Sequence, residues 1–187
     1  MVGFCVPISA PGVTIGPEAK TFGMRGMVQN TVYFDNVEVD SSRLLGEPGG
    51  GMAVAQYVMQ RGRLMIAAAC IGGMKRCVQL MVRYGSRRTL STGNLLENQF
   101  WTHRVAEICN EVSALECLVS IVAAREDAQQ TIPPDVFAAL KITAPEFFWR
   151  AADSLVQMLG GRGYIDTNIA PQLLRDARVA RILEGPT

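Results

Sequence analysis

The chain has 187 residues, with 18 lysines and arginines against 17 aspartates and glutamates, so its formal net charge is +1. This balance argues against a sequence-independent nucleic-acid binder, which needs a surplus of cations to neutralise phosphates. Hydrophobic residues make up 49% and charged residues 19% of the chain, a composition typical of globular proteins and not of disordered ones.

The N-terminal part carries the strand and turn signals. We predict a strand over Val2 to Ile8, a turn at Pro11-Gly12 and a short strand over Val13 to Ile15. The segment Gln29 to Val39 predicts a further strand, because its side chains alternate between two faces with a period of two residues. The proline and three glycines of Glu47 to Gly51 break this pattern and indicate a domain boundary.

The rest of the chain is typical of helices. The first is predicted over about Met52 to Tyr84, and it is apolar on most of its surface, which indicates burial on several sides. The second is predicted over about Glu97 to Ala128. Its apolar residues recur in steps of four and three, the pattern of a left-handed bundle seam. The residues of this seam are Trp101, Val105, Ile108, Val112, Leu115, Val119 and Val122.

Two further helices follow. We expect the third to begin after Pro133-Pro134, with Asp135 as N-cap, and to end at Gly160-Gly161. Pro145 should kink or interrupt it, because a proline inside a helix removes a backbone donor. The fourth helix is predicted over about Pro171 to Ile182.

These elements predict an α+β fold, mainly α, in which a short β segment precedes a four-helix bundle. We place a partial β domain at residues 1–50 and the bundle, incomplete at its end, at residues 51–187. Large apolar side chains lie on both faces of Gln29 to Val39, so this strand needs more packing partners than the chain supplies. We therefore expect the chain to be cut out of a longer protein at both ends.

Several classes of site and location are excluded or disfavoured. The apolar run Leu64 to Met74 has 11 residues, whereas a bilayer span takes about 20, so we predict no membrane span. No signal peptide is evident, and the five cysteines form no metal-ligand pattern, which predicts reduced thiols, no metal site and a cytoplasmic location. Since His103 has no recognisable nucleophile partner, we do not expect a Cys–His hydrolase. Four cysteines in apolar helical patterns are expected to act as small hydrophobes: Cys70, Cys77, Cys109 and Cys117.

Four motifs resemble the acyl-CoA dehydrogenase family and occur in the family's order. They are a G-x-R-G stretch leading to F-x-[DN]-V-x-V and L-L-G-E (Gly23 to Ala55), RGRLMIAAACIGG (Arg61 to Gly73), DSLVQMLGGRGYI (Asp153 to Ile165) and RDARVARILEGPT (Arg175 to Thr187). The resemblance covers nearly the whole chain. It implies the second half of the family's β domain followed by most of its C-terminal four-helix up-down bundle.

The resemblance also implies a reaction, the α,β-dehydrogenation of an acyl thioester with bound FAD. In the family a carboxylate removes the α proton while the β hydrogen leaves as hydride to flavin N5. Glu184, within I-L-E-G-P-T, lies at the position of this base, and Gly185 gives the backbone freedom there. Some members instead carry the base just before the arginine that is Arg63 here, but that position is Gly62. Arg63 is expected to place the base or the acyl-CoA, or to form a buried ion pair.

The resemblance implies cofactor contacts as well. Arg88 resembles the arginine that meets the FAD pyrophosphate, with Arg87 as an alternative, and a guanidinium suits phosphate oxygens because it donates paired hydrogen bonds. Gln157, Gly160 and Gly161 resemble the stretch that touches FAD from a neighbouring subunit, although a helix C-cap would also explain the glycines. A shared cofactor implies a homodimer or homotetramer.

The leading interpretation is therefore an FAD-dependent acyl-CoA dehydrogenase acting on an acyl-CoA or acyl-carrier thioester, with an electron-transferring flavoprotein as possible acceptor. An acyl-CoA oxidase or flavin monooxygenase of the same superfamily is the alternative enzyme. A non-catalytic helical assembly module is the alternative of another class, and three departures from the family pattern favour it: Ser91, Leu183 and Pro186. We expect the isolated chain to be inactive and to bind FAD weakly.

Overall fold

The computed structural model describes residues 1–187 as two compact units, residues 1–60 and residues 61–187. The helix α1 (Gly51–Gly85) contributes its first ten residues to the first unit and the remainder to the second. The domain boundary predicted at residue 50 stays a prediction.

The first unit contains two antiparallel strand pairs. The two-residue strand β1 (Gly3–Phe4) pairs with β4 (Leu44–Leu45), and β2 (Val13–Glu18) pairs with β3 (Asn30–Phe34). The strand predicted from Val2 to Ile8 is thus much shorter than expected. A turn closes where the Ala10 amide donates to the Pro7 carbonyl, and it ends the extended segment early. A 3-10 turn, η1 (Ser41–Arg43), precedes β4.

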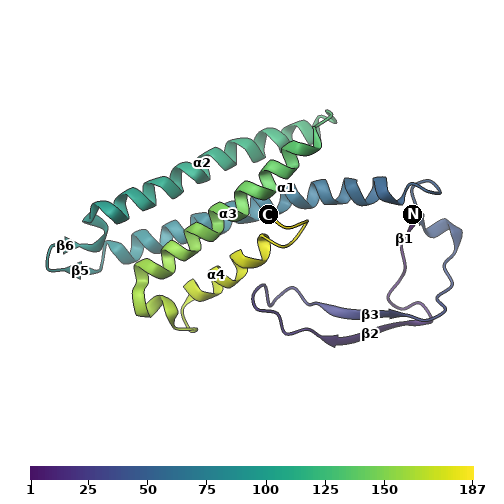
Figure 1. Ribbon diagram of the computed structural model, residues 1–187, viewed down its shortest axis with the longest axis horizontal. Helices are drawn as coiled ribbons and strands as arrows, with labels where there is room; N and C mark the ends of the chain where they lie inside the picture. Colours follow the sequence, from purple (N-terminus) through teal and green to yellow (C-terminus); the bar gives the residue numbers. More distant parts are fainter. The chain divides into compact units, whose positions relative to one another are not determined.

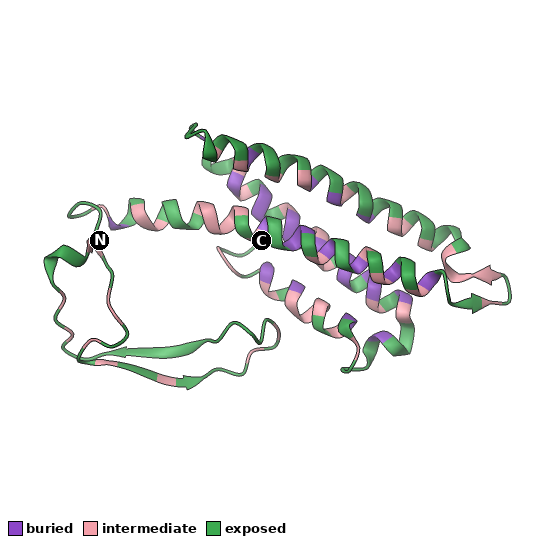
Figure 2. Cartoon of the chain, turned by 180° about the vertical axis from the view of Figure 1, so that it is seen from behind, coloured by how far each residue is buried: buried purple, intermediate pink, exposed green.

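The β2–β3 ribbon exposes large apolar side chains on both of its faces. Val32 is 41% and Phe34 63% exposed on one face, and Tyr33 is 55% exposed on the other. Figure 2 shows the ribbon as almost entirely exposed. The prediction of apolar groups on both faces is confirmed.

The second unit is a four-helix bundle made by α1, α2 (Gln99–Asp127), α3 (Pro134–Leu159) and α4 (Ile169–Ala180). Consecutive helices run in opposite directions (Figure 1), so the up-down bundle is confirmed. Short elements occupy the connections: β5 (Thr89–Leu90), β6 (Gly93–Asn94) and η2 (Leu95–Glu97) between α1 and α2, and η3 (Gly160–Tyr164) between α3 and α4.

One hydrophobic core joins the four helices. Ile108, Val112, Leu115 and Val122 of the predicted α2 seam are buried, and the other seam residues pack against the same core, so this prediction is confirmed. Helix α3 is buried on a broad face because it packs against α2 and α4. Each fully buried large apolar side chain in this core, such as Leu155, stabilises the fold by roughly 1.5–3 kcal/mol.

The ends of α3 differ in detail from the prediction. Pro134 is the first helical residue and Pro133 the N-cap, so the assignment of Asp135 as cap is wrong. A proline suits the first position because it lacks only an amide that would be unpaired there, and the Asp135 carboxylate in the first turn complements the helix dipole. Pro145 is buried within a helix that continues through it without a break. Gly160 caps the C-terminus with a φ of 59°.

The cysteines fall into two groups. Cys70 and Cys77 on α1 are buried as predicted, and burial raises the pKa of each thiol to about 12. Cys109 and Cys117 are exposed, so the expectation that they act as small hydrophobes within an apolar helix pattern is wrong. Both lie on α2 one or two residues beyond the seam positions Ile108 and Leu115, which turns them away from the core.

Helix α1 is long and apolar enough to cross a membrane by length and composition alone, with 33% of its most apolar window buried inside the protein. Its buried face, which includes Ala67, Met74 and Met81, lies in the bundle core. The predicted absence of a membrane span stays a prediction.

Candidate functional site

The carboxylate of Glu184 lies directly over Gly62. A β-carbon placed on Gly62 would be 2.5 Å from Glu184 Oε1 and 2.6 Å from its Cδ, much closer than ordinary contact. The carboxylate therefore occupies the space that any side chain at residue 62 would need. The two positions that the family resemblance offers for a base converge on one place in the bundle.

The loop after α4 aims this carboxylate. The helix ends at Ala180, and Glu184 then adopts a left-handed backbone with a φ of 56°, followed by Gly185 with a φ of 100°. A left-handed conformation costs a non-glycine residue about 1–3 kcal/mol, and such strain persists only where surrounding contacts hold it. The turn at Glu184 is thus fixed by its packing and not by local preference.

Arg63 supplies one of these contacts. Its Nε donates a hydrogen bond to the backbone carbonyl of Glu184 at 3.3 Å. The structure brings Arg63 to the loop that carries the predicted base, and the contact described is with the backbone. An ion pair between α3 and the C-cap residue of α4 holds the start of the same loop. In it, Arg181 Nε lies 2.6 Å from Oε1 of Glu146 on α3. The Arg181 guanidinium also lies 5.7 Å from the ring centroid of Trp149 on α3.

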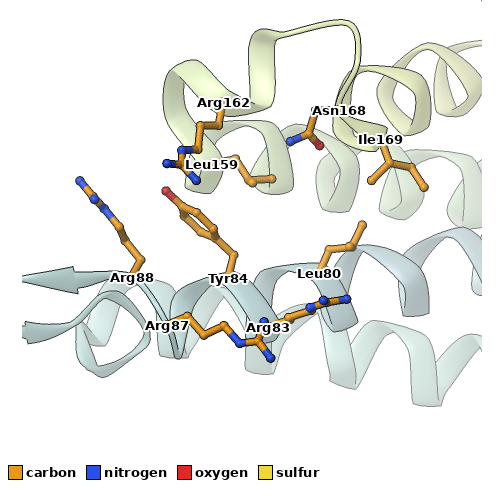
Figure 3. Close-up of a pocket in the computed structure, with 9 residues that line it drawn as sticks. All are labelled: Leu80, Arg83, Tyr84, Arg87, Arg88, Leu159, Arg162, Asn168 and Ile169. Carbon is orange, nitrogen blue, oxygen red and sulfur yellow. The ribbon is translucent and has the colours of Figure 1, made fainter.

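A cationic cleft of about 450 Å³ lies between the C-terminal end of α1 and the segment joining α3 to α4. In Figure 3, Arg162 and Tyr84 point toward one another across it, and Arg88 extends from the turn that follows α1. The main chain fixes Arg88, whose amide donates to the Tyr84 carbonyl and whose carbonyl accepts from the Leu95 amide. The residues that line the cleft are Leu80, Arg83, Tyr84, Arg87, Arg88, Leu159, Arg162, Asn168 and Ile169.

The cleft is chemically suited to a multiply charged anion. Four guanidinium groups, a phenol and a carboxamide line it, and no carboxylate does. Arginines bind phosphate oxygens through paired, charge-assisted hydrogen bonds, so a diphosphate fits this set. An FAD pyrophosphate is thus compatible with the residues present.

The sequence-predicted cofactor residues are only partly assembled here. Arg87 and Arg88 both line the cleft, whereas Gln157, Gly160 and Gly161 are exposed beside it and do not. Leu159 and Arg162, which flank the two glycines, are the lining residues. The expectations did not include Arg162, although an arginine directly after a glycine pair at a helix end is a signal that could have pointed to it.

Comparisons with known proteins agree with the motifs. The family described as "Acyl-CoA dehydrogenase, C-terminal domain" matches residues 49–187. Very long-chain specific acyl-CoA dehydrogenase from Bos taurus is 32% identical over 185 residues, covering 99% of this chain and 28% of the relative. Short-chain specific acyl-CoA dehydrogenase from Homo sapiens is 28% identical over 182 residues, covering 97% of this chain and 44% of the relative.

The fold agrees with solved structures too. Butyryl-CoA dehydrogenase from Megasphaera elsdenii superposes with a TM-score of 0.94 at 25% identity, over 99% of this chain and 48% of that one. The chain therefore spans less than half the length of each of these similar proteins.

Proposed function

Since this chain belongs to the acyl-CoA dehydrogenase family, we propose that the whole protein binds FAD and oxidises an acyl thioester between its α and β carbons, with Glu184 as the base. The observation that carries the proposal is the Glu184 carboxylate fixed over Gly62.

Glu184 would take the α proton. A carboxylate becomes a stronger base when an acyl chain excludes water around it, because the charged form loses solvation. The left-handed turn and the Arg63 hydrogen bond to the loop limit the directions in which this carboxylate can point. A fixed base transfers a proton faster than a mobile one because little ordering remains to be done in the transition state.

The arginine cleft would hold the cofactor. Arg88 and Arg162 would bind the pyrophosphate of FAD, and Tyr84 would donate a further hydrogen bond. FAD, when bound, supplies the acceptor for the hydride that leaves the β carbon. Gln157, Gly160 and Gly161 are proposed as additional contacts at the edge of the cleft, where the exposed glycines allow close approach of a ligand.

The spacing along α1 supports a cofactor shared between subunits. Gly62 and Tyr84 are 22 residues apart on one continuous helix, which corresponds to about 33 Å. This distance is much longer than the short ribityl chain that joins the flavin ring to the diphosphate. One FAD therefore cannot reach both Glu184 and the cleft of the same chain, and we propose a homodimer or homotetramer in which each cofactor meets two chains.

The test uses the full-length protein. We expect it to purify with FAD and to lose its flavin colour when an acyl-CoA is added without oxygen. Glu184→Gln should keep the flavin and bleach about 10²- to 10⁴-fold more slowly, because an amide cannot accept the proton. Glu116→Gln, which alters an exposed carboxylate paired with Lys75, is the matched control and should bleach normally. A Glu184→Gln protein with normal bleaching would exclude Glu184 as the base.

The cleft has a test of its own. Arg88→Ala should weaken FAD binding and reduce the dependence of that binding on salt. Arg76→Ala is the control and should do neither, because Arg76 is an exposed arginine on α1 that bonds Gln79. A full-length protein that takes up no FAD would favour the helical assembly module. Reoxidation of the reduced protein by oxygen would favour an oxidase, and reoxidation only by an electron-transferring flavoprotein would favour a dehydrogenase.

A further inference from the structure

A buried cation lies beneath the loop that carries Glu184. Lys141 on α3 is 3% exposed, and it is the one charged side chain in the bundle core. Burying an ammonium group is unfavourable unless its donors are satisfied. The position of Lys141 therefore calls for an explanation in terms of what its Nζ holds.

The Lys141 Nζ donates a hydrogen bond to the backbone carbonyl of Arg181 at 3.2 Å. Its surroundings do not favour the charge. Burial and Arg63 on α1 lower the pKa of the ammonium, Cys70 and Glu146 oppose that shift, and Arg181 lowers the pKa further. Because burial and the two arginines together disfavour a cation, electrostatic stabilisation by the surroundings does not explain a lysine at this position.

The backbone carbonyl of Arg181 accepts the hydrogen bonds that close the loop of residues 181–187. It accepts one hydrogen bond from the Lys141 Nζ and another, at 3.1 Å, from the amide of Thr187. The second bond joins the two ends of the segment 181–187. The Glu146 carboxylate fastens the same two residues through Arg181 Nε at 2.6 Å and the Thr187 hydroxyl at 3.1 Å. Glu184 lies at the middle of this closed loop, with its carboxylate over Gly62.

We propose that Lys141 is a positioning residue, whose ammonium anchors the Arg181 carbonyl and thereby keeps the Glu184 carboxylate over Gly62 without touching the substrate. The inference rests on the proposed role of Glu184 as base. It predicts that removing the Nζ slows proton abstraction and loosens residues 181–187, while the cofactor cleft and substrate affinity stay as they were.

The experiment compares three variants of the full-length protein with the wild type. Lys141→Met removes the donor but keeps the length and packing, and replacing a buried charge with an apolar side chain is tolerated by many folds. Lys141→Arg keeps a charged donor. Lys75→Met removes an exposed lysine of the same bundle that pairs with Glu116, and it serves as the control.

Two readouts separate positioning from general packing. In Lys141→Met, amide hydrogen exchange within residues 181–187 should be about tenfold faster, since a charge-assisted hydrogen bond is lost. The anaerobic bleaching rate and kcat should fall about tenfold to a hundredfold, with KM and FAD content changed by less than about twofold. Lys141→Arg should stay within about threefold of the wild type in both readouts, and Lys75→Met should be unchanged.

The outcomes distinguish the two proposals. If the wild type does not bleach, the proposed function fails, and faster exchange of residues 181–187 still supports the anchor. If the wild type bleaches and Lys141→Met matches it in rate and exchange, the positioning role is overturned and the function stands. If Lys141→Met does not fold, Lys141→Arg decides: near-normal exchange and rate support the donor role, and a large loss overturns it.

Discussion

Replacing Gly62 with alanine should disable the proposed base without weakening the fold. Ordinary contact to a β-carbon begins near 3.4 Å. The Glu184 Oε1 lies 2.5 Å from the position that a β-carbon on residue 62 would take, so the carboxylate must move by about 0.9 Å. A displacement of this size at a reacting group lowers a rate by about a hundredfold, or about 2.7 kcal/mol in activation free energy. Alanine is also favoured over glycine inside a helix by about 1 kcal/mol, so stability should hold or rise.

The assay measures anaerobic flavin bleaching by an acyl-CoA and the thermal midpoint of the full-length protein. Gly72→Ala on the same helix is the control, because a β-carbon on Gly72 would meet no atom within 4 Å. It should share the gain in helix stability and keep the wild-type rate. A folded Gly62→Ala protein that bleaches at the wild-type rate would refute the reasoning that ties the Glu184 carboxylate to this position.

Three further predictions concern stability and thiol reactivity. Gly73→Ala should destabilise the protein by about 1–3 kcal/mol in urea unfolding, because its β-carbon would run into the buried Phe148 ring, whereas the neighbouring Gly72→Ala should not. In the native chain at about pH 8, a thiol reagent should quickly modify the three exposed cysteines, Cys5, Cys109 and Cys117. It should spare Cys70 and Cys77, because pKa values of about 12 leave little thiolate on these two buried residues. Rapid reaction of all five would contradict the burial of Cys70 and Cys77. Burial lowers the pKa of the Lys141 ammonium below its ordinary 10.5, so the unfolded chain binds that proton more tightly and stability should rise as the pH increases through the lowered pKa toward 10.5. Urea unfolding across that range should show this rise in the wild type and its loss in Lys141→Met.

The long helices could be predicted from the sequence because their periodicity is local. The α2 seam from Trp101 to Val122 repeats over many turns, and the structure buries it as expected. The two-residue strands β5 and β6 could not be predicted, because they are too short to show alternation. The residue type of Asp135 favours a cap, but the proline before it already begins the helix.

The site could be predicted only as separate pieces. The motifs single out Glu184 and Gly62, but nothing local says that they share one space, since the contact joins helix α1 to a loop more than a hundred residues later. The sequence does not signal the burial of Lys141 for the same reason, because its neighbour Arg63 lies on α1 and its neighbour Arg181 lies just after α4. Long-range packing, and not local pattern, assembles this part of the molecule.

The two-faced apolar ribbon of β2 and β3 has a practical consequence. Each strand has one partner only, so both outer edges present unpaired amides and carbonyls beside exposed side chains such as Tyr33 and Phe34. Unpaired strand edges beside exposed apolar side chains pair with strands of other molecules, which leads to aggregation. A charged residue or a proline in place of Val32 should therefore reduce aggregation of this chain at high concentration.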